Sequence, residues 1–265
     1  MFVGLNVKVE FGSVKDFILK NGDSKYYFAT GDIYQLEPVK SLTTMKYNDM
    51  CIKSIFKDCL YLAKSKRFTY KEDIVKLHKI KKMLFVDGVS NIEICKKYFK
   101  KSEGMSKNDL GISYKNNTCK EVNNKVHGNK GFYPGLKVIC SKWLKGFNVN
   151  DTYIIKSISS KSVVIEFDDE THELKTSVFK EHFDYPYCRT AHSMQGLTTK
   201  QNIHIFDVNF YHADNNKAWL WVCITRAKSL DNIFYSCWKN FILSKNFKNG
   251  LIFFENLKKS GFGYI

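Results

Sequence analysis

The stretch that decides the fold is Thr190-Ala191-His192-Ser193-Met194-Gln195-Gly196-Leu197-Thr198. It places hydroxyl, imidazole and amide side chains in one short segment, and these groups can hydrogen-bond phosphate oxygens. Gly196 allows the backbone to approach a ligand closely, and Gln195 can point at an anion or a water molecule. The stretch therefore predicts an anion-binding turn, although a polar turn by itself is also typical of a solvated surface.

A second segment, Ile224-Thr225-Arg226-Ala227-Lys228, follows about thirty residues later. Arg226 supplies a planar, permanently charged fork that suits a phosphate whose charge is changing. A lone arginine is usually a solvated surface residue. The functional interpretation therefore depends on the two segments occurring together.

A third segment, Gly31-Asp32-Ile33-Tyr34-Gln35-Leu36-Glu37-Pro38-Val39, follows an apolar run over 26–30 that predicts a buried parallel strand. Open α/β sheets bind ligands beyond the carboxyl ends of their strands, so Asp32 and Gln35 are expected to face a nucleotide site. The alternative is a simple Gly-Asp turn before a proline-limited loop. Tyr34 offers a ring for base stacking, or only for packing.

Taken in chain order, the segments that begin at Gly31, Thr190 and Ile224 resemble motifs III, V and VI of superfamily 1 nucleic-acid helicases, closest to the RecD-like and Dda-like branch. The family reads roughly GDxxQLxPV, then T-x-H-x-x-QG, then a hydrophobic run that ends in TRA or SRA. The resemblance extends from about residue 26 to residue 240. It implies an α/β fold with a RecA-like, P-loop-NTPase-type parallel sheet, and ATP hydrolysis coupled to stepping along a single strand of DNA.

The resemblance also implies roles for individual residues. Arg226 would be the arginine finger, and Gln35 and Gln195 would complete the catalytic set. Asp32, Gly196 and Lys115 would contact the nucleotide, with Lys115 standing where some relatives carry a phosphate-contacting arginine. The nucleic-acid contacts would come from Thr190, His192, Ser193, Tyr34 and Trp143.

The chain divides into three expected parts. Residues 1–104 would be a remnant of the first RecA-like motor domain with a helical linker. Residues 105–130 and 184–265 would form the second motor domain. Residues 131–183 would be an inserted SH3-like β-barrel, because this region reads as short strands separated by polar turns, at Leu136–Cys140, Thr152–Ile158 and Ser162–Asp168.

The predicted barrel carries a basic and aromatic cluster that is a candidate for holding a single strand. Its members are Lys137, Lys142, Trp143 and Lys145. An ordinary solvated surface is the alternative.

The sequence contains no G-x-x-x-x-G-K-[ST] loop to cradle phosphates, and the acidic pair of the family would fall upstream of Met1. We therefore expect the carboxyl-terminal half of a helicase, which needs a P-loop-bearing half before it binds ATP and Mg²⁺. Two alternatives remain, a non-catalytic module that binds single strands and a fragment of an RNA helicase. A metabolic α/β enzyme is disfavoured, since no nucleophile–base pair or metal-ligand spacing is found.

The composition agrees with a polyanionic partner. Of the 265 residues, 42 are Lys or Arg and 26 are Asp or Glu, which gives a formal net charge of +16. A lysine-rich codon bias would explain part of this excess. The eight cysteines have no C-x-x-C spacing, and we expect reduced, buried thiols. The sequence contains no run of about eighteen apolar residues, so no membrane-spanning helix is predicted. We expect an intracellular protein of the cytoplasm, the nucleus or a viral replication site.

Local patterns predict the remaining elements. Capping boxes are expected at Thr69–Glu72, Ser90–Glu93 and Thr118–Glu121. Strands are expected at 109–114, 202–208 and 232–236, and helices at 14–20, 48–63, 218–224 and 237–248. His182, His204 and His212 lack paired ligand spacing and are expected to be structural or exposed.

Overall fold

The computed structural model describes residues 34, 36, 67, 68, 70–128 and 130–236. The chain forms two units, Met1–Lys64 and Ser65–Ile265, and the described helices and strands lie in the second. The strand expected at 26–30 and the helices expected at 14–20, 48–63 and 237–248 lie outside the described residues. So do Asp32 and Gln35.

The second unit contains a five-stranded parallel sheet in the order β1-β10-β9-β2-β8. The expected strands at 109–114, 202–208 and 232–236 are confirmed as the three inner strands. The bounds are β1 (Lys100–Lys101), β2 (Leu110–Ser113), β8 (Cys188–Thr190), β9 (Ile203–Ile205) and β10 (Ile233–Tyr235).

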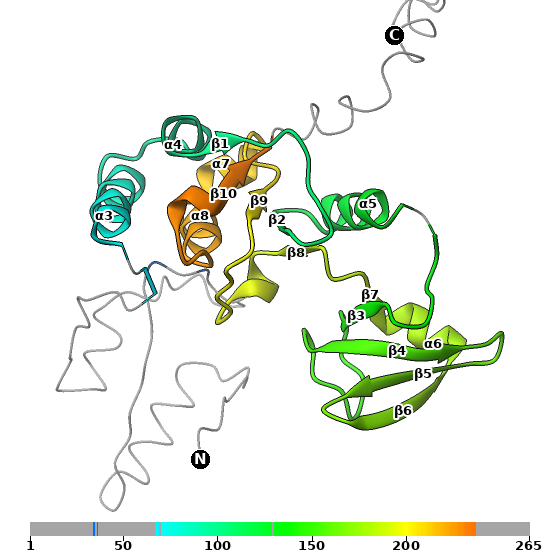
Figure 1. The fold of residues 1–265 in the computed structure, drawn as a ribbon. Coiled ribbons are helices and arrows are strands. Elements are labelled where there is room, and N and C mark those ends of the chain that lie inside the picture. The colour runs from blue at the N-terminus through cyan, green and yellow to red at the C-terminus, as the bar shows by residue number, and fades with distance from the viewer. Residues whose placement is uncertain (1–33, 35, 37–66, 69, 129, 237–265) are drawn as a thin grey trace, which may run out of the picture. The chain divides into compact units, whose positions relative to one another are not determined.

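Helices cover both faces of this sheet, as Figure 1 shows. Helix α5 packs on β2 and β8, whereas α4 contacts β1 and α3 contacts α8. The bounds are α3 (Lys71–Phe85), α4 (Asn91–Tyr98), α5 (Asn116–His127), α7 (Tyr211–Asn215) and α8 (Lys217–Ile224). This is the α/β arrangement that the sequence predicts.

Hydrophobic burial holds the parallel sheet together. Ile112, Ile203 and Ile205 are fully buried, as expected for strands covered on both faces. Helix α8 is buried from Trp219 to Ile224, which confirms the apolar helix predicted at 218–224. None of the helices that the structure describes is long and apolar enough to cross a membrane.

The three predicted capping boxes have different outcomes. Ser90 and Glu93 form the box at the start of α4, as predicted. The box at Thr118 is wrong, because α5 begins at Asn116 and the Thr118 hydroxyl donates to Asp207 Oδ1 at 2.9 Å. The box at Thr69 is also wrong, because α3 begins at Lys71 and its N-cap is Tyr70, with no side-chain cap.

A second, antiparallel sheet lies between α5 and β8 in the chain, with the strand order β6-β5-β4-β3-β7. Its bounds are β3 (Lys137–Cys140), β4 (Thr152–Ile158), β5 (Ser162–Phe167), β6 (Glu170–Lys175), α6 (Thr176–His182) and β7 (Phe183–Asp184). The three predicted strands are confirmed. In the described pairing β6 and β7 are the edges, so closure into an SH3-like barrel stays a prediction.

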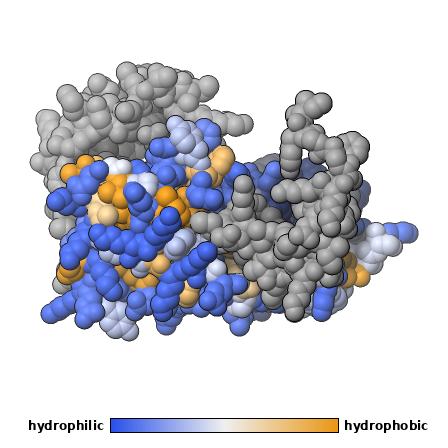
Figure 2. All heavy atoms as spheres, turned by 90° about the horizontal axis from the view of Figure 1, so that it is seen from above, coloured by the Kyte–Doolittle hydropathy of each residue, from blue (hydrophilic) through white to orange (hydrophobic). Residues whose placement is uncertain are grey.

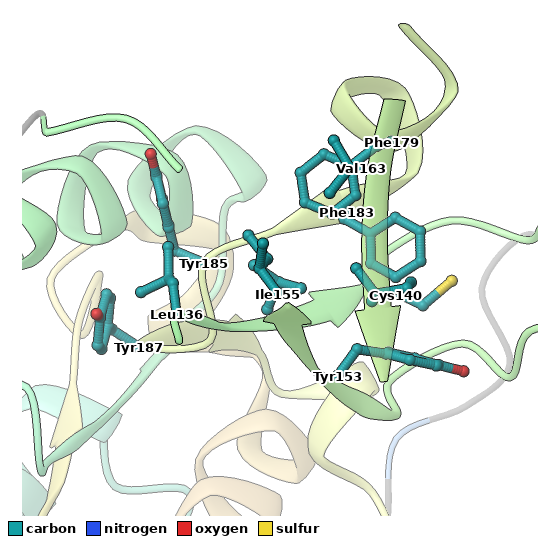
Figure 3. Packing of buried hydrophobic residues seen from close by; sticks show 11 residues of the cluster. Leu136, Cys140, Tyr153, Ile155, Val163, Phe179, Phe183, Tyr185 and Tyr187 are labelled. Atoms are coloured by element: carbon teal, nitrogen blue, oxygen red, sulfur yellow. The ribbon is translucent and has the colours of Figure 1, made fainter. Parts of the chain in front are cut away.

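The core of the antiparallel sheet is aromatic (Figure 3). Phe179 of α6 stacks on Phe183 of β7, with ring centroids 5.1 Å apart, and Tyr153 of β4 meets Phe183 edge-on at 5.4 Å. Cys140 also lies in this core. The five described cysteines, at positions 95, 119, 140, 188 and 223, are all buried, which confirms the burial predicted for them.

Candidate functional site

The Thr190–Thr198 segment forms a compact turn at the carboxyl end of β8. Ala191 and Met194 are buried and anchor it, while a short 3₁₀ helix, η2 (His192–Met194), turns the chain. Ser193 Oγ donates to the Thr190 carbonyl at 2.9 Å. His192 is exposed and Thr190 is half-buried, so the predicted contact residues form one polar surface at the sheet edge where parallel sheets bind ligands.

Gly196 is needed for its backbone conformation. Its φ angle is +84°, a left-handed value that side chains with a Cβ rarely adopt. A Cβ built at this position would meet no atom within 4 Å. Among the described residues the space beside Gly196 is open, and the close approach of a ligand there stays a prediction.

Arg226 is buried and binds this turn. Only 1% of its surface is exposed, and Nη1 donates to the carbonyls of Met194 and Leu197 at 3.3 and 3.0 Å. Nε donates to the Val222 carbonyl at 3.0 Å, and Nη2 donates to Thr225 Oγ1 at 3.0 Å. One guanidinium thus joins the end of α8 to both flanks of Gln195.

In this structure the Arg226 guanidinium donates to main-chain carbonyls of the turn and of α8 from within the protein. The role of Arg226 as an arginine finger stays a prediction, as do the roles of Gln195 and Gly196.

Arg67 is a further residue of this region, and the sequence interpretation missed it. Its Nη1 donates to the Thr225 carbonyl, beside Arg226. The available signal was composition, because only three of the 42 basic residues are arginine, at positions 67, 189 and 226. In a lysine-rich chain the rare arginines mark sites where a planar fork of donors is required.

Arg189, the third arginine, lies one residue before Thr190 and links the two sheets. Its Nη1 donates to the Asn150 carbonyl at 3.3 Å, and Nη2 donates to Thr152 Oγ1 at 3.4 Å. Burial lowers the pKa of Arg189, and the nearby Asp151 carboxylate opposes that shift. The polar turn is therefore connected directly to the beginning of β4.

Lys115 lies at a different place, immediately before α5. Its main-chain N–H donates to Asp207 Oδ2 at 3.0 Å, and its Nζ lies 3.5 Å from the centre of the Phe210 ring. Asp207 also accepts a hydrogen bond from Tyr114 N and has a left-handed φ of 62°. This buried carboxylate fixes the position of Lys115, whose contact with a phosphate stays a prediction.

Trp143 is exposed to 74% on the segment that connects β3 to β4. A bridge between Leu144 and Phe147 fixes this tight loop, and Lys142 and Lys145 are exposed within it. A large exposed ring flanked by ammonium groups is the combination used to stack bases and attract phosphates.

The structure brings some of the predicted residues together and leaves others apart. Thr190, His192, Ser193, Gln195 and Gly196 share the turn that Arg226 binds. Lys115 and Trp143 lie on other elements. Tyr34 is a half-buried turn residue of the first unit, and Asp32 and Gln35 are outside the described residues. The expected cleft between Gln35 and the pair Gln195–Arg226 therefore stays a prediction.

The parallel sheet and the helices that cover it form a RecA-like α/β fold. No protein-family model matches the chain, and no curated protein sequence matches it. Solved structures of Pif1 helicases do match.

The Bacteroides Pif1 helicase in complex with ADP-AlF3 and single-stranded DNA has a TM-score of 0.53 and 17% identity, covering 87% of this chain. Bacteroides Pif1 bound to single-stranded DNA has a TM-score of 0.52, with the same identity and coverage. The chain spans 66% of each of these proteins, and 54% of a Pif1 helicase at forked double-stranded DNA, where the TM-score is 0.48 and the identity 18%. At this identity the first two structures show only that the chain shares the fold of these proteins. The finer RecD-like or Dda-like placement stays a prediction.

Proposed function

We propose that this chain is the carboxyl-terminal part of an ATP-dependent superfamily 1 DNA helicase. In this proposal the exposed side chains of the Thr190–Gly196 turn hold single-stranded nucleic acid, and Trp143 with its neighbouring lysines adds a stacking contact. The observation that carries the proposal is the bond between Arg226 and both flanks of the turn, since it ties motifs V and VI together in a RecA-like fold.

The binding part of this proposal is tested by a salt titration. Binding of a fluorescent oligothymidine to the full chain should weaken as salt rises, with a log–log slope of about −0.7 for each phosphate contacted. His192→Ala should weaken binding, because it removes an exposed side chain of the turn without touching the buried Arg226. Lys200→Ala is the matched control, since Lys200 is exposed after the turn. Equal affinities of the two variants would contradict the proposed contact.

The catalytic part requires a phosphate-binding loop, and this sequence has no Walker A pattern. We propose that a P-loop-bearing amino-terminal half of the helicase supplies this loop and the Mg²⁺ site. Co-expression with this half should produce ATP hydrolysis that DNA stimulates. Hydrolysis by this chain alone, lost in Arg226→Lys, would overturn the requirement for a partner.

A non-catalytic single-strand-binding module is the second candidate, and the buried position of Arg226 favours it. Both candidates bind single strands, but only the helicase part changes its affinity for DNA when ATP is added with the P-loop-bearing half. An RNA helicase fragment is separated from both by competition between DNA and RNA oligonucleotides of the same sequence.

A further inference from the structure

A cavity of about 410 Å³ lies on the parallel sheet, away from the polar turn. Its lining comes from β1, β9, β10 and the loop that joins β1 to β2. Strands β10, β9 and β2 separate β1 from β8, so at the usual spacing the two edges are about 19 Å apart. The cavity is therefore a place distinct from the Thr190–Thr198 turn, and its function does not depend on the one proposed above.

The floor of the cavity is flat and aromatic. His204 of β9 and Phe234 of β10 are paired across the two strands, so their side chains lie on the same face. Their rings stack, with centroids 5.1 Å apart and planes inclined by 14°. A flat heteroaromatic ligand can extend such a stack, because aromatic faces accept any nucleobase.

Hydrogen bonds hold the floor and the adjoining wall in place. Ser102 Oγ lies 2.7 Å from His204 Nδ1, and Asp109 Oδ2 lies 3.5 Å from His204 Nε2. Burial lowers the pKa of His204, and the Asp109 carboxylate opposes that shift. Ser102 Oγ also donates to the Gly104 carbonyl at 3.1 Å, so the imidazole is held at both of its ring nitrogens by groups that are themselves fixed.

One side of the cavity offers hydrogen-bond acceptors. Asp109 accepts from Ser106 N at 2.7 Å and from Asn202 Nδ2 at 3.1 Å, and it retains lone pairs for further donors. The carboxylate of Glu103 is exposed beside it. Among nucleobases, guanine presents adjacent N–H donors that suit a carboxylate, and the amide of Asn202 can both donate and accept.

The other side of the cavity is basic. Lys100 and Lys101 form the edge strand β1 and are both exposed. Lysines on an edge strand also discourage pairing with another sheet, which is their purely structural explanation. Lys100 pairs with Phe234 across β1 and β10, so its side chain lies on the face that carries the Phe234 and His204 rings. The side chain of Lys101 lies on the opposite face of the strand, so Lys100 is the lysine that a phosphate group at this cavity would neutralise.

We propose that this cavity binds a guanosine 5′-phosphate unit. In this arrangement the base stacks on Phe234, whose ring packs against the buried ring of His204. The donors of the base meet Asp109 and Asn202, and the phosphate meets Lys100. The unit comes either as the free nucleotide or as the 5′-end of a strand. Figure 2 shows one face of the protein, on which hydrophilic residues surround scattered apolar ones.

The test is calorimetric titration of the full chain with guanosine monophosphate. We expect saturable binding that weakens about tenfold in Phe234→Leu, which keeps an apolar side chain but removes the ring. Asn202→Ala, at an exposed position, should also weaken binding, and it covers the case in which the strand variant does not fold. Lys100→Gln/Lys101→Gln should weaken it as well.

The matched control is Lys96→Gln/Lys97→Gln, which removes the same charge from exposed lysines of α4 outside the cavity. An oligonucleotide with a 5′-phosphorylated guanosine that binds tighter than free guanosine monophosphate assigns the site to strand ends. Equal affinities assign it to the free nucleotide. The proposal is overturned by an absence of saturable binding, or by equal weakening in the control and in the Lys100/Lys101 variant.

Different variants test single-strand binding by the turn and nucleotide binding by the cavity, so either proposal can be refuted without the other. Trp143→Ala and His192→Ala should leave the affinity for guanosine monophosphate unchanged, because both residues lie outside the cavity. Asn202→Ala should leave the affinity for oligothymidine unchanged, because thymine does not present the guanine donors. Loss of oligothymidine binding with retained nucleotide binding would therefore count only against the function proposed for the turn.

Discussion

Arg226 and Leu197 are 29 residues apart in the sequence, and Arg226 Nη1 donates to the Leu197 carbonyl at 3.0 Å. The same nitrogen also donates to the Met194 carbonyl, so the buried guanidinium hydrogen-bonds the backbone of the turn at two positions from the protein interior. The exposed side chains of the turn are displayed on a segment whose backbone is fixed from the interior.

Arg226 should therefore contribute strongly to stability. We expect Arg226→Ala to lower the free energy of unfolding by about 3 kcal/mol or more, because several buried carbonyls lose a charged donor. Arg226→Lys should lower the free energy of unfolding less than Arg226→Ala does, because lysine keeps the positive charge but lacks the planar fork of donors. Urea unfolding measures the change. Lys228→Ala, at an exposed position nearby, should stay within about 0.5 kcal/mol, and an unchanged midpoint in Arg226→Ala would refute the structural role.

Asn123 should also be a stabilising residue. Its Nδ2 donates to the Cys188 carbonyl at 3.1 Å, and Cys188 N donates to its Oδ1 at 2.7 Å, so one side chain satisfies both main-chain groups. We expect Asn123→Ala to cost about 2–3 kcal/mol, because it leaves buried groups unpaired. The neighbouring Asn124 is exposed, and Asn124→Ala is the control in the same urea experiment. Similar losses in both variants would contradict this.

Trp143 should affect nucleic-acid affinity without affecting stability. We expect Trp143→Ala to weaken binding of a single-stranded oligonucleotide about 5- to 100-fold, the range for loss of one base-stacking ring. Fluorescence anisotropy measures the affinity. Tyr211→Ala is the control, because Tyr211 is also 74% exposed but lies on α7. If both variants lose affinity equally, the effect does not come from stacking at Trp143.

His204 should make stability depend on pH. Burial lowers its pKa below the usual 6.5, so the unfolded chain takes up this proton at a higher pH than the folded protein. The stability is then fully present above about pH 6.5 and is lost as the pH falls toward the folded pKa, by at most about 1.4 kcal/mol per pH unit. Asp109 has a pKa lowered from 3.8, so its own contribution is lost only in more acidic solution.

The measurement is the urea midpoint at about pH 7.5 and about pH 5.5. The decrease in wild type should be smaller in His204→Gln, which cannot be protonated. His212→Gln is the control, because His212 is exposed. A decrease of the same size in wild type and in His204→Gln would show that other groups cause it.

Apolar runs made much of the fold predictable from the sequence. The segments around Ile112, Ile165 and Ile203 form buried strands, because burial of β-branched side chains determines their conformation. Strand β6 (Glu170–Lys175) was missed because its residues are polar and mostly exposed. Its place is fixed by pairing with β5, which a single segment does not reveal.

Long-range hydrogen bonds account for most of what the sequence left undetermined. Thr118 fits a capping box locally, yet its hydroxyl is taken by Asp207, 89 residues away. The surroundings of Arg226 depend on the carbonyls that the folded turn presents, and carbonyls carry no sequence signal. The location of the polar turn was predictable because it lies within one short segment. The partners of its arginines were not.

The antiparallel sheet begins after α5 and returns to the parallel sheet at β8, and Asn123 of α5 bonds Cys188 of β8. The chain therefore leaves the parallel-sheet part at α5 and re-enters it at the neighbouring strand β8. A short peptide in place of residues 131–183 would leave every pairing of the parallel sheet possible. The antiparallel sheet can thus be exchanged or altered during evolution as one unit, which would change the ligands that it binds and leave the strand pairing of the parallel sheet intact.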